Sequence, residues 1–522
     1  MSGLIRRVSW PLFVVGGLVL GMVLGRVLGR LPAFAHFGDV AMLCPLGGAV
    51  IGYVIGRAGA RTTSASTVHG SARFATERQI QASLGGAKGL IVGRETKRHG
   101  RLLRYGGQAH LLTIAPTRSG KGVGAIIPNL LTAERSILCI DPKGENARIA
   151  AGARHRLGPV HVLDPFGASG LPSAAFNPLD ALNPESLDLA EDAALLADAL
   201  VYDPPGQGGE AHWNEEAKAL IGGLILHVVT APGQSSNLAT VRELLTLAPD
   251  DFDRLLRAMQ QNPAAGGLVA RAANRHLGKS DREAASVLSS AQRHTHFLDS
   301  QRMVQVLSRS DFRFEDLKAG TVTVFLVLPP ERLSTHARWL RLLVAQAINA
   351  MARSPARPAA PVLFLLDEFA ALGRLEPVER AFGLMAGYGL QLWPILQDKH
   401  QLWSVYGDRA GTFLSNAGLI QIFNVADVET ASWVSKSIGA TTVTYQTSGT
   451  SISKSPGRFL LDQTTTGAST SVHLTRRDLL TPDEVMRQDG GLEILLLQGQ
   501  APVIAQKVRY FADPEFQGLF QG

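Results

Sequence analysis

Short apolar runs alternate with segments of helical periodicity from residue 110 onward. Seven runs are rich in aliphatic and β-branched residues and have the length of strands, at 110–115, 136–141, 160–164, 322–328, 362–367, 390–396 and 419–425. Continuous apolar runs with helices between them are typical of parallel strands buried on both faces. The pattern therefore predicts an α/β fold with a mostly parallel sheet covered by helices.

The strand signal disappears between about residues 180 and 310, where four segments carry helical periodicity, at 189–201, 215–229, 241–247 and 282–297. We expect an all-α insertion domain at 180–310, so that the sheet domain comprises 61–179 and 311–522. Residues 440–472 are rich in Ser, Thr and Gly and predict an exposed loop or a loose hairpin.

Two uncharged, mostly apolar runs precede the body, at residues 8–25 and 40–56. At about 1.5 Å per residue, each is nearly as long as the hydrocarbon layer of a membrane is thick. Basic residues flank the pair on its outer sides, which favours cytoplasmic ends, although Arg26 and Arg30 between the runs oppose this orientation. A cleaved signal peptide is disfavoured because a second apolar run follows the first. We predict an N-terminal two-helix transmembrane hairpin within residues 1–60.

Composition narrows the class of protein. The 522 residues are 45% hydrophobic and 18% charged, which excludes a disordered chain. The two cysteines cannot build a disulfide framework, and this favours a cytosolic body. Residues 1–110 hold 14 Lys and Arg against 3 Asp and Glu, whereas the remainder holds 37 against 41. This distribution fits a segment beside anionic lipid better than a uniformly basic nucleic-acid-binding domain.

The pattern of a phosphate-binding loop follows the first predicted strand, at 110–115, and precedes a predicted helix. It reads APTRSGKG at residues 115–122. Backbone N–H groups of such a loop bind phosphate oxygens, and Lys121 would reach the β- and γ-phosphates. The motif normally ends in Ser or Thr, whose hydroxyl binds Mg²⁺, but Gly122 holds this position. The predicted nucleotide-binding residues are Ala115, Pro116, Thr117, Arg118, Ser119, Gly120, Lys121, Gly122 and Val123.

Two other predicted strands end in polar residues suited to nucleotide hydrolysis. The run at 362–366 leads to Asp367 and Glu368, the Walker B pattern. Asp367 would hold Mg²⁺ through water and Glu368 would activate the attacking water. The same two acids are also favourable at the start of any helix. The run at 390–396 leads to Gln397, which would sense the γ-phosphate or be an ordinary polar residue at a strand end.

Further charged residues lie near these motifs. Arg374 and Arg380 lie between the two acids and Gln397 and are the candidates for an arginine finger, which would act on the site of a neighbouring subunit. The segment DPKGE at 141–145 serves nucleotide or subunit contacts, or forms only a charged turn.

Eight short motifs follow the N-terminal apolar runs in a fixed order. They are HGSAR at 69–73, PTRSGKGVG at 116–124, DPKGE at 141–145, FNPLD at 176–180, WNEEAK at 213–218, LDEF at 366–369, QD at 397–398 and RDLLTPDEV at 477–485. In this order they resemble the type IV coupling proteins of conjugation and type IV secretion, in their TraG branch. The resemblance runs over nearly the whole chain, and members of this branch commonly have Gly at the position of Gly122.

The resemblance implies a RecA-like P-loop ATPase that assembles as a homo-hexamer and binds ATP and Mg²⁺. It implies a multi-pass anchor in the bacterial inner membrane, beside lipid, with the ATPase body in the cytoplasm. Such proteins recruit a relaxase–single-stranded DNA complex from the relaxosome and feed it to components of the type IV secretion channel, using ATP hydrolysis.

For this chain the resemblance assigns phosphate binding to Lys121, magnesium binding to Asp367, water activation to Glu368 and γ-phosphate sensing to Gln397. The helical insertion would then recognise the substrate. The sequence ends at Gly522, and we expect it to lack a long acidic tail of the kind that some relatives use to contact relaxosome proteins.

Three other functions fit parts of this pattern. A non-hydrolysing receptor that docks protein effectors or DNA is compatible with Gly122, whereas Glu368 and Gln397 favour hydrolysis. A double-stranded DNA pump would share the motor, but such pumps usually have more membrane spans and an added DNA-reading domain. A receptor for effector proteins without DNA is not separated from DNA transfer by the sequence.

Overall fold

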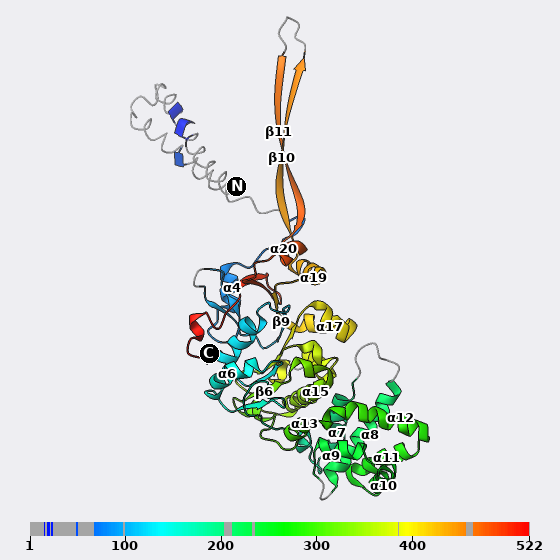
Figure 1. Ribbon diagram of the computed structural model, residues 1–522. Coiled ribbons are helices and arrows are strands. Elements are labelled where there is room, and N and C mark those ends of the chain that lie inside the picture. Colours follow the sequence, from blue (N-terminus) through cyan, green and yellow to red (C-terminus); the bar gives the residue numbers. More distant parts are fainter. Residues whose placement is uncertain are drawn as a thin grey trace. The chain divides into compact units, whose positions relative to one another are not determined.

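The computed structural model describes residues 15, 18–20, 22–23, 49–50, 67–97, 100–202, 211–231, 235–384, 386–455 and 463–520 (Figure 1). Most of the predicted transmembrane hairpin therefore lies outside the described residues. None of the helices in the described part is both long enough and apolar enough to cross a membrane. The chain forms two compact units, Met1–Ala72 with Gly439–Leu479, and Arg73–Ile438 with Leu480–Gly522.

The larger unit contains an 11-stranded sheet in the order β2-β1-β13-β12-β9-β3-β8-β7-β4-β6-β5. The strands from β9 to β5 pair in parallel, which confirms the predicted parallel sheet. All residues of these strands are buried except the first two of the edge strand β5, because helices cover both faces. The bounds are β3 (His110–Ile114), β4 (Ile137–Asp141), β5 (Val160–Leu163), β6 (Thr323–Val327), β7 (Val362–Leu366), β8 (Leu390–Leu396) and β9 (Ala417–Phe423).

Four antiparallel strands extend this sheet beyond β9, and the sequence pattern predicts none of them. They are β1 (Leu90–Arg94), β2 (Leu102–Tyr105), β12 (Leu492–Leu497) and β13 (Val503–Gln506). β12 pairs with β9 and with β13, and β13 pairs with β1. β12, from the C-terminal end of the unit, therefore lies beside β9, whereas β1 and β2, from its N-terminal end, form the outer edge of the sheet.

Helices α5 (Ile127–Thr132) and α6 (Glu145–His155) pack on one face of the sheet, where they share a hydrophobic core with alternate residues of the strands. On the other face, the His110 ring of β3 lies against Phe382 of α16 (Glu376–Leu384), and α18 (Ala410–Asn416) packs on β3 and β9. The remaining helices of this part are α4 (Glu77–Leu84), α14 (Asp316–Ala319), α15 (Pro330–Arg353), α17 (Lys399–Tyr406), α19 (Val428–Ile438) and α20 (Pro482–Met486).

Every described element between β5 and β6 is helical. The segments expected to be helices are present as α7 (Leu189–Leu200), α8 (Ala211–Thr230), α9 (Leu238–Leu245) and α12 (Asp281–Thr295), and α10 (Pro249–Gln260), α11 (Ala264–Leu277) and α13 (Gln301–Val306) add to them. α8 lies among α7, α11 and α12, and α7 packs on α15 of the sheet domain (Figure 1). The compact units divide the chain at other positions, so the predicted domain boundaries stay predictions.

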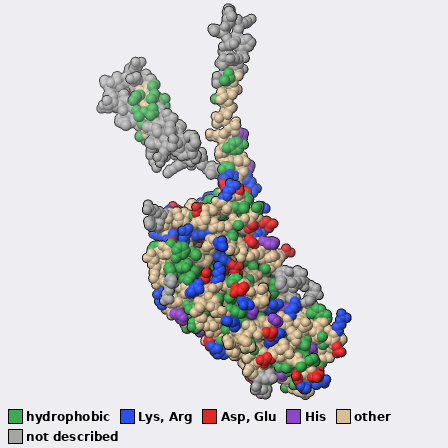
Figure 2. Space-filling view, in the orientation of Figure 1, with side chains coloured by type: hydrophobic (Ala, Val, Ile, Leu, Met, Phe, Trp, Pro, Cys, Tyr) green, Lys and Arg blue, Asp and Glu red, His purple; other side chains and the backbone are tan. Residues whose placement is uncertain are grey.

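The smaller unit contains an antiparallel ribbon of two 16-residue strands, β10 (Ala440–Ser455) and β11 (Gln463–Asp478). The chain segment that ends at Ala72 is attached to the base of the ribbon, where the N–H of Ala72 donates to the carbonyl of Ala440 at 3.0 Å. The Ser- and Thr-rich residues thus form a regular hairpin rather than a loose one. Among the ribbon side chains that the structure describes, the charged ones are Arg476, Arg477 and Asp478 at the base, and the face in Figure 2 shows almost none farther along the described part.

Candidate nucleotide-binding site

The phosphate-binding loop connects β3 to a helical segment, as the sequence predicts. Its first residue is fixed to the neighbouring strand, since the N–H of Ala115 donates to the carbonyl of Leu396 at 2.7 Å. The loop then turns sharply, with positive φ at Arg118 (63°) and Gly120 (93°). A π-helical turn at Gly122–Ile126 follows and continues into α5. The loop therefore ends at the start of a helical segment, where free backbone N–H groups attract anions.

The two acids at the end of β7 converge on the loop lysine. The Lys121 ammonium lies 2.8 Å from Asp367 Oδ1 and 2.6 Å from Glu368 Oε1. Glu368 has a left-handed backbone with φ of 49°, and its N–H donates to Asp367 Oδ1 at 2.9 Å. A non-glycine residue in this region is strained, and such strain is concentrated at functional sites. Both carboxylates therefore contact the same ammonium.

Gln397 completes the cluster. β8 lies between β3 and β7, so its last residues lie between the loop and the acids. Gln397 Nε2 donates to Glu368 Oε2 at 3.0 Å, and the Gln397 N–H donates to Gln401 Oε1 at 2.9 Å. The strand order therefore brings Lys121, Asp367, Glu368 and Gln397 together at one edge of the sheet, where open α/β sheets bind their ligands.

Burial and charge act in opposite directions on this cluster. Burial raises the pKa of Asp367 above its ordinary value, although the ammonium of Lys121 opposes the shift. Burial also lowers the pKa of Lys121, but Asp367 and Glu368 together outweigh it, so that this pKa is raised. The lysine is therefore held in its charged form by the two acids.

Asp141 of the DPKGE segment has a structural partner. It ends β4, next to β7, and its Oδ2 accepts from the N–H of Ala147 at 2.8 Å in the first turns of α6. Burial raises the pKa of its carboxyl to about 6, with Asp367 contributing to the shift. Asp141 thus anchors the start of α6 beneath the candidate site, a function that the sequence interpretation left open.

Gly122 and the two candidate arginines lie in open surroundings. A Cβ atom on Gly122 would meet no other atom within 4 Å, so the site has room for a side chain there. Arg374 and Arg380 are 47% and 60% exposed, with Glu379 at 3.5 Å and Glu376 at 3.9 Å respectively. Neither arginine is placed by any described contact in the cluster around Lys121.

The structure adds one basic residue that the sequence motifs do not include. Lys507 follows β13, and its Nζ donates to the carbonyl of Ser119 in the phosphate-binding loop at 2.9 Å. It also donates to Asn424 Oδ1, at the end of β9. No spacing pattern in the sequence connects Lys507 with the loop, because the contact depends on the order of strands.

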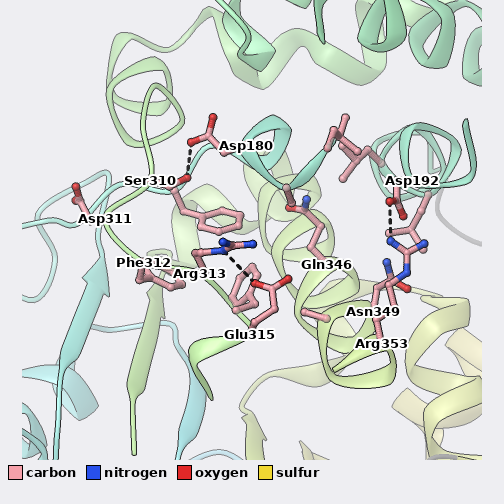
Figure 3. A pocket seen from close by; sticks show the side chains of 17 residues that line it. Asp180, Asp192, Ser310, Asp311, Phe312, Arg313, Glu315, Gln346, Asn349 and Arg353 are labelled. Carbon is pink, nitrogen blue, oxygen red and sulfur yellow. Dashed lines mark hydrogen bonds and ion pairs between the residues drawn. The ribbon is translucent and has the colours of Figure 1, made fainter. Parts of the chain in front are cut away.

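A separate cavity of about 470 Å³ lies where the helical insertion joins the sheet domain (Figure 3). It is lined by residues of α7, of α15 and of the two connecting segments, and Asp192 of α7 pairs there with Arg353 of α15 at 2.6 Å. No residue of the cluster around Lys121 lines this cavity, so it is distinct from the candidate nucleotide site.

A family model described as type IV secretory system conjugative DNA transfer matches residues 73–520. The chain belongs to this family. The family match confirms the resemblance to type IV coupling proteins and, at the level of the family, the predicted function in transferring DNA through a type IV secretion system.

Curated relatives of this family member include the conjugal transfer protein TraG of Escherichia coli, which is 31% identical over 510 residues, covering 86% of this chain and 78% of TraG. The protein VirD4 of Agrobacterium fabrum is 29% identical, covering 87% of this chain and 67% of VirD4.

Two solved structures have the same fold as this family member. The unbound bacterial conjugative coupling protein TrwBdeltaN70 matches with a TM-score of 0.63 at 14% identity, over 86% of this chain and 97% of its own. The plasmid coupling protein TrwB in complex with ADP and Mg²⁺ matches with a TM-score of 0.61 at 15% identity, over 84% and 93%. The likeness confirms the α/β fold of the sheet domain.

Proposed function

We propose that this protein is the ATP-driven coupling protein of a type IV secretion system. In this proposal it recruits a relaxase bound to single-stranded DNA and moves the complex toward the secretion channel. The observation that carries the proposal is the convergence of Lys121, Asp367, Glu368 and Gln397 in one cluster, in which Lys121 contacts both acids and Gln397 contacts Glu368. This arrangement is typical of P-loop ATPases. The plasmid coupling protein TrwB, which has a similar fold, was solved in complex with ADP and Mg²⁺.

The residues present fit a magnesium nucleotide. Asp367 offers a carboxylate, the ligand type that Mg²⁺ prefers when water and phosphate oxygens fill its other positions. Within the described ranges no three His, Cys, Asp or Glu side chains are grouped to hold a metal ion by themselves, so a metal held here would rely on the phosphates. When bound, Mg²⁺ neutralises charge on the β- and γ-phosphates.

Each residue of the cluster then has a distinct task. Lys121 exchanges its two carboxylate partners for phosphate oxygens, which frees Glu368 to accept a proton from the attacking water. Gln397 holds the Glu368 carboxylate at 3.0 Å and would sense the γ-phosphate. The backbone of residues 115–123 binds the other phosphate oxygens.

Assembly and membrane attachment complete the proposal. A homo-hexamer would bring an exposed arginine, Arg374 or Arg380, to the site of the neighbouring subunit, where it would stabilise charge in the transition state. Residues 8–25 and 40–56 would anchor the protein in the bacterial inner membrane, with the body in the cytoplasm. The helical insertion, α7 to α13, would recognise the cargo.

A second candidate function is a receptor that docks protein effectors or DNA without hydrolysing ATP. It is supported by Gly122, which provides no hydroxyl for Mg²⁺. The two proposals differ in what they require of Glu368, since only hydrolysis needs a base beside the attacking water.

The test is ATP turnover by the full chain in lipid vesicles, with and without single-stranded DNA. We expect turnover that rises with DNA and with protein concentration, and that is lost in Lys121→Ala and Glu368→Gln. Nucleotide binding without turnover, unchanged in Glu368→Gln, would favour the docking receptor. Absence of both binding and turnover in the parent protein would contradict both proposals.

A further inference from the structure

The C-terminal part of the sheet places a second ammonium group against the phosphate-binding loop. Lys507 Nζ donates to the Ser119 carbonyl at 2.9 Å and lies 4.5 Å from the centroid of the Phe423 ring. It also donates to the side chain of Asn424. Lys507 is thus fixed by the end of β9 on one side and contacts the loop on the other.

The contact controls the direction of one peptide group. The Ser119 carbonyl and the Gly120 N–H belong to the same trans peptide and point in opposite directions. An ammonium that holds the carbonyl therefore fixes the Gly120 N–H on the opposite side of this peptide. Gly120 has φ of 93°, a conformation that glycine adopts without the steric strain that a side chain would cause.

Asn424 supports the same interpretation. It has a positive φ of 30°, a backbone conformation that is uncommon outside glycine and that asparagine adopts more readily than most residues. This conformation occurs at the residue whose side chain accepts from the Lys507 ammonium. The end of β9 therefore supplies a side-chain acceptor for Lys507.

We propose that Lys507 is a positioning residue of the nucleotide site, which holds the phosphate-binding loop in its binding conformation through the Ser119 carbonyl. The inference rests on the proposed nucleotide site and adds to it a contribution from the C-terminal strands. Lys507 acts through the loop, so its loss weakens nucleotide binding more than it slows the chemical step.

The charges that surround Lys507 set the pH range of this effect. Glu493 of β12, Asp489 and Arg509 are the charged groups that act on it. Burial lowers the pKa of Lys507 to about 8, with Glu493 opposing the shift and Arg509 adding to it. The group is therefore charged at pH 7 and loses its charge as the pH rises toward 9, so nucleotide affinity should fall over this interval.

The experiment compares Lys507→Met with Arg509→Met in the full chain in lipid vesicles, with a fluorescent ADP analogue as the probe. Arg509 is the next basic residue of the same segment, and its side chain is exposed. We expect Lys507→Met to weaken binding of the analogue at pH 7 by about tenfold, since one charge-assisted contact is lost, while kcat changes by less than about threefold. Arg509→Met should bind the analogue as the parent does. At pH 9, Lys507→Arg should bind it more tightly than the parent, because the guanidinium keeps its charge.

Two outcomes would overturn the inference. One is unchanged binding in Lys507→Met, and the other is a loss of kcat with unchanged binding. The double variant Lys507→Met with Glu493→Gln removes both ionisable side chains, so it serves if the single variant fails to fold, and it must show the same loss of affinity. Loss of analogue binding in the parent and in Arg509→Met would instead contradict the proposed nucleotide site itself.

Discussion

The parallel and the antiparallel parts of the sheet contribute to the candidate site in different ways. In the parallel part, β3, β7 and β8 each end at a residue or loop that contacts the cluster around Lys121. In the antiparallel part, β13 leads to Lys507, which contacts the loop across 388 positions of sequence. The residues proposed for hydrolysis thus lie in short sequence motifs. The contact of Lys507 with the phosphate-binding loop depends instead on pairing between strands that are distant in the sequence.

The largest effect is expected at the parallel edge, from Glu368→Gln. The amide cannot accept a proton from water, so kcat should fall by about 100-fold or more, while nucleotide binding is retained. Steady-state turnover and binding of a fluorescent nucleotide, measured side by side, check this. A variant with turnover near that of the parent would exclude Glu368 as the base.

The next effect is expected from Gln397→Ala. Loss of the amide removes the 3.0 Å hydrogen bond that holds the Glu368 carboxylate, so we expect turnover to fall by about 10- to 100-fold. Gln401→Ala is the matched control, because the Gln401 side chain accepts from the backbone N–H of Gln397. Equal losses in the two variants would indicate that Gln397 has only a structural role.

The antiparallel part should respond in stability rather than in turnover. Glu493 is buried in β12, and burial raises the pKa of its carboxyl well above the ordinary value of 4.5. The folded protein therefore holds this proton more tightly than the unfolded chain. As the pH rises above 4.5, the free energy of unfolding falls, because the unfolded chain ionises this carboxyl more easily. Glu493→Gln should raise the free energy of unfolding at neutral pH by about 1 to 2 kcal/mol, with a smaller gain in acid.

Thermal melting between pH 5 and pH 8 measures this gain. The hydrogen bond from Gln421 Nε2, at 2.7 Å, can be kept by the new amide oxygen. A gain that is equal at all pH values would mean that the carboxyl is not the group that titrates, and a loss at neutral pH would contradict the prediction.

The smallest effect is expected from Gly122→Ser. The open space around Gly122 accommodates the side chain, and its hydroxyl would add a ligand for Mg²⁺. We expect binding of the magnesium nucleotide to tighten by about threefold, or roughly 0.7 kcal/mol. Gly122→Ala provides the control without a hydroxyl. Weaker magnesium-dependent binding in Gly122→Ser than in the parent would oppose the view that the glycine leaves the metal one ligand short.

The two parts of the sheet also differ in how well the sequence predicts them. β7 is a continuous apolar run and β8 is apolar apart from Gln391, because both of their faces are covered, so their position can be read directly from the sequence. β2 and β13 are four residues long and only partly buried, which is too short for a clear periodic pattern. Their position depends on pairing with distant strands, a contact that no local pattern records.

The candidate site follows the same division. Lys121, Asp367, Glu368 and Gln397 were identified from motifs, and the structure brings them together, although their roles stay proposals. The contacts of Lys507 with the loop and of Asp141 with the start of α6 can be predicted only when it is known which strand ends are neighbours. The ribbon of β10 and β11 shows a further limit, because a hairpin exposed on both faces has no buried side and hence no apolar alternation to reveal it.

The ribbon leaves and rejoins the rest of the chain at neighbouring points, since the Leu479 N–H donates to the Gly439 carbonyl at 2.9 Å. A segment whose two ends are adjacent can be lengthened, shortened or exchanged during evolution at little cost to the fold on either side of it. The ribbon is therefore a module in the evolutionary sense, and Gly439 and Leu479 mark where a reporter domain or an affinity tag can be inserted in its place.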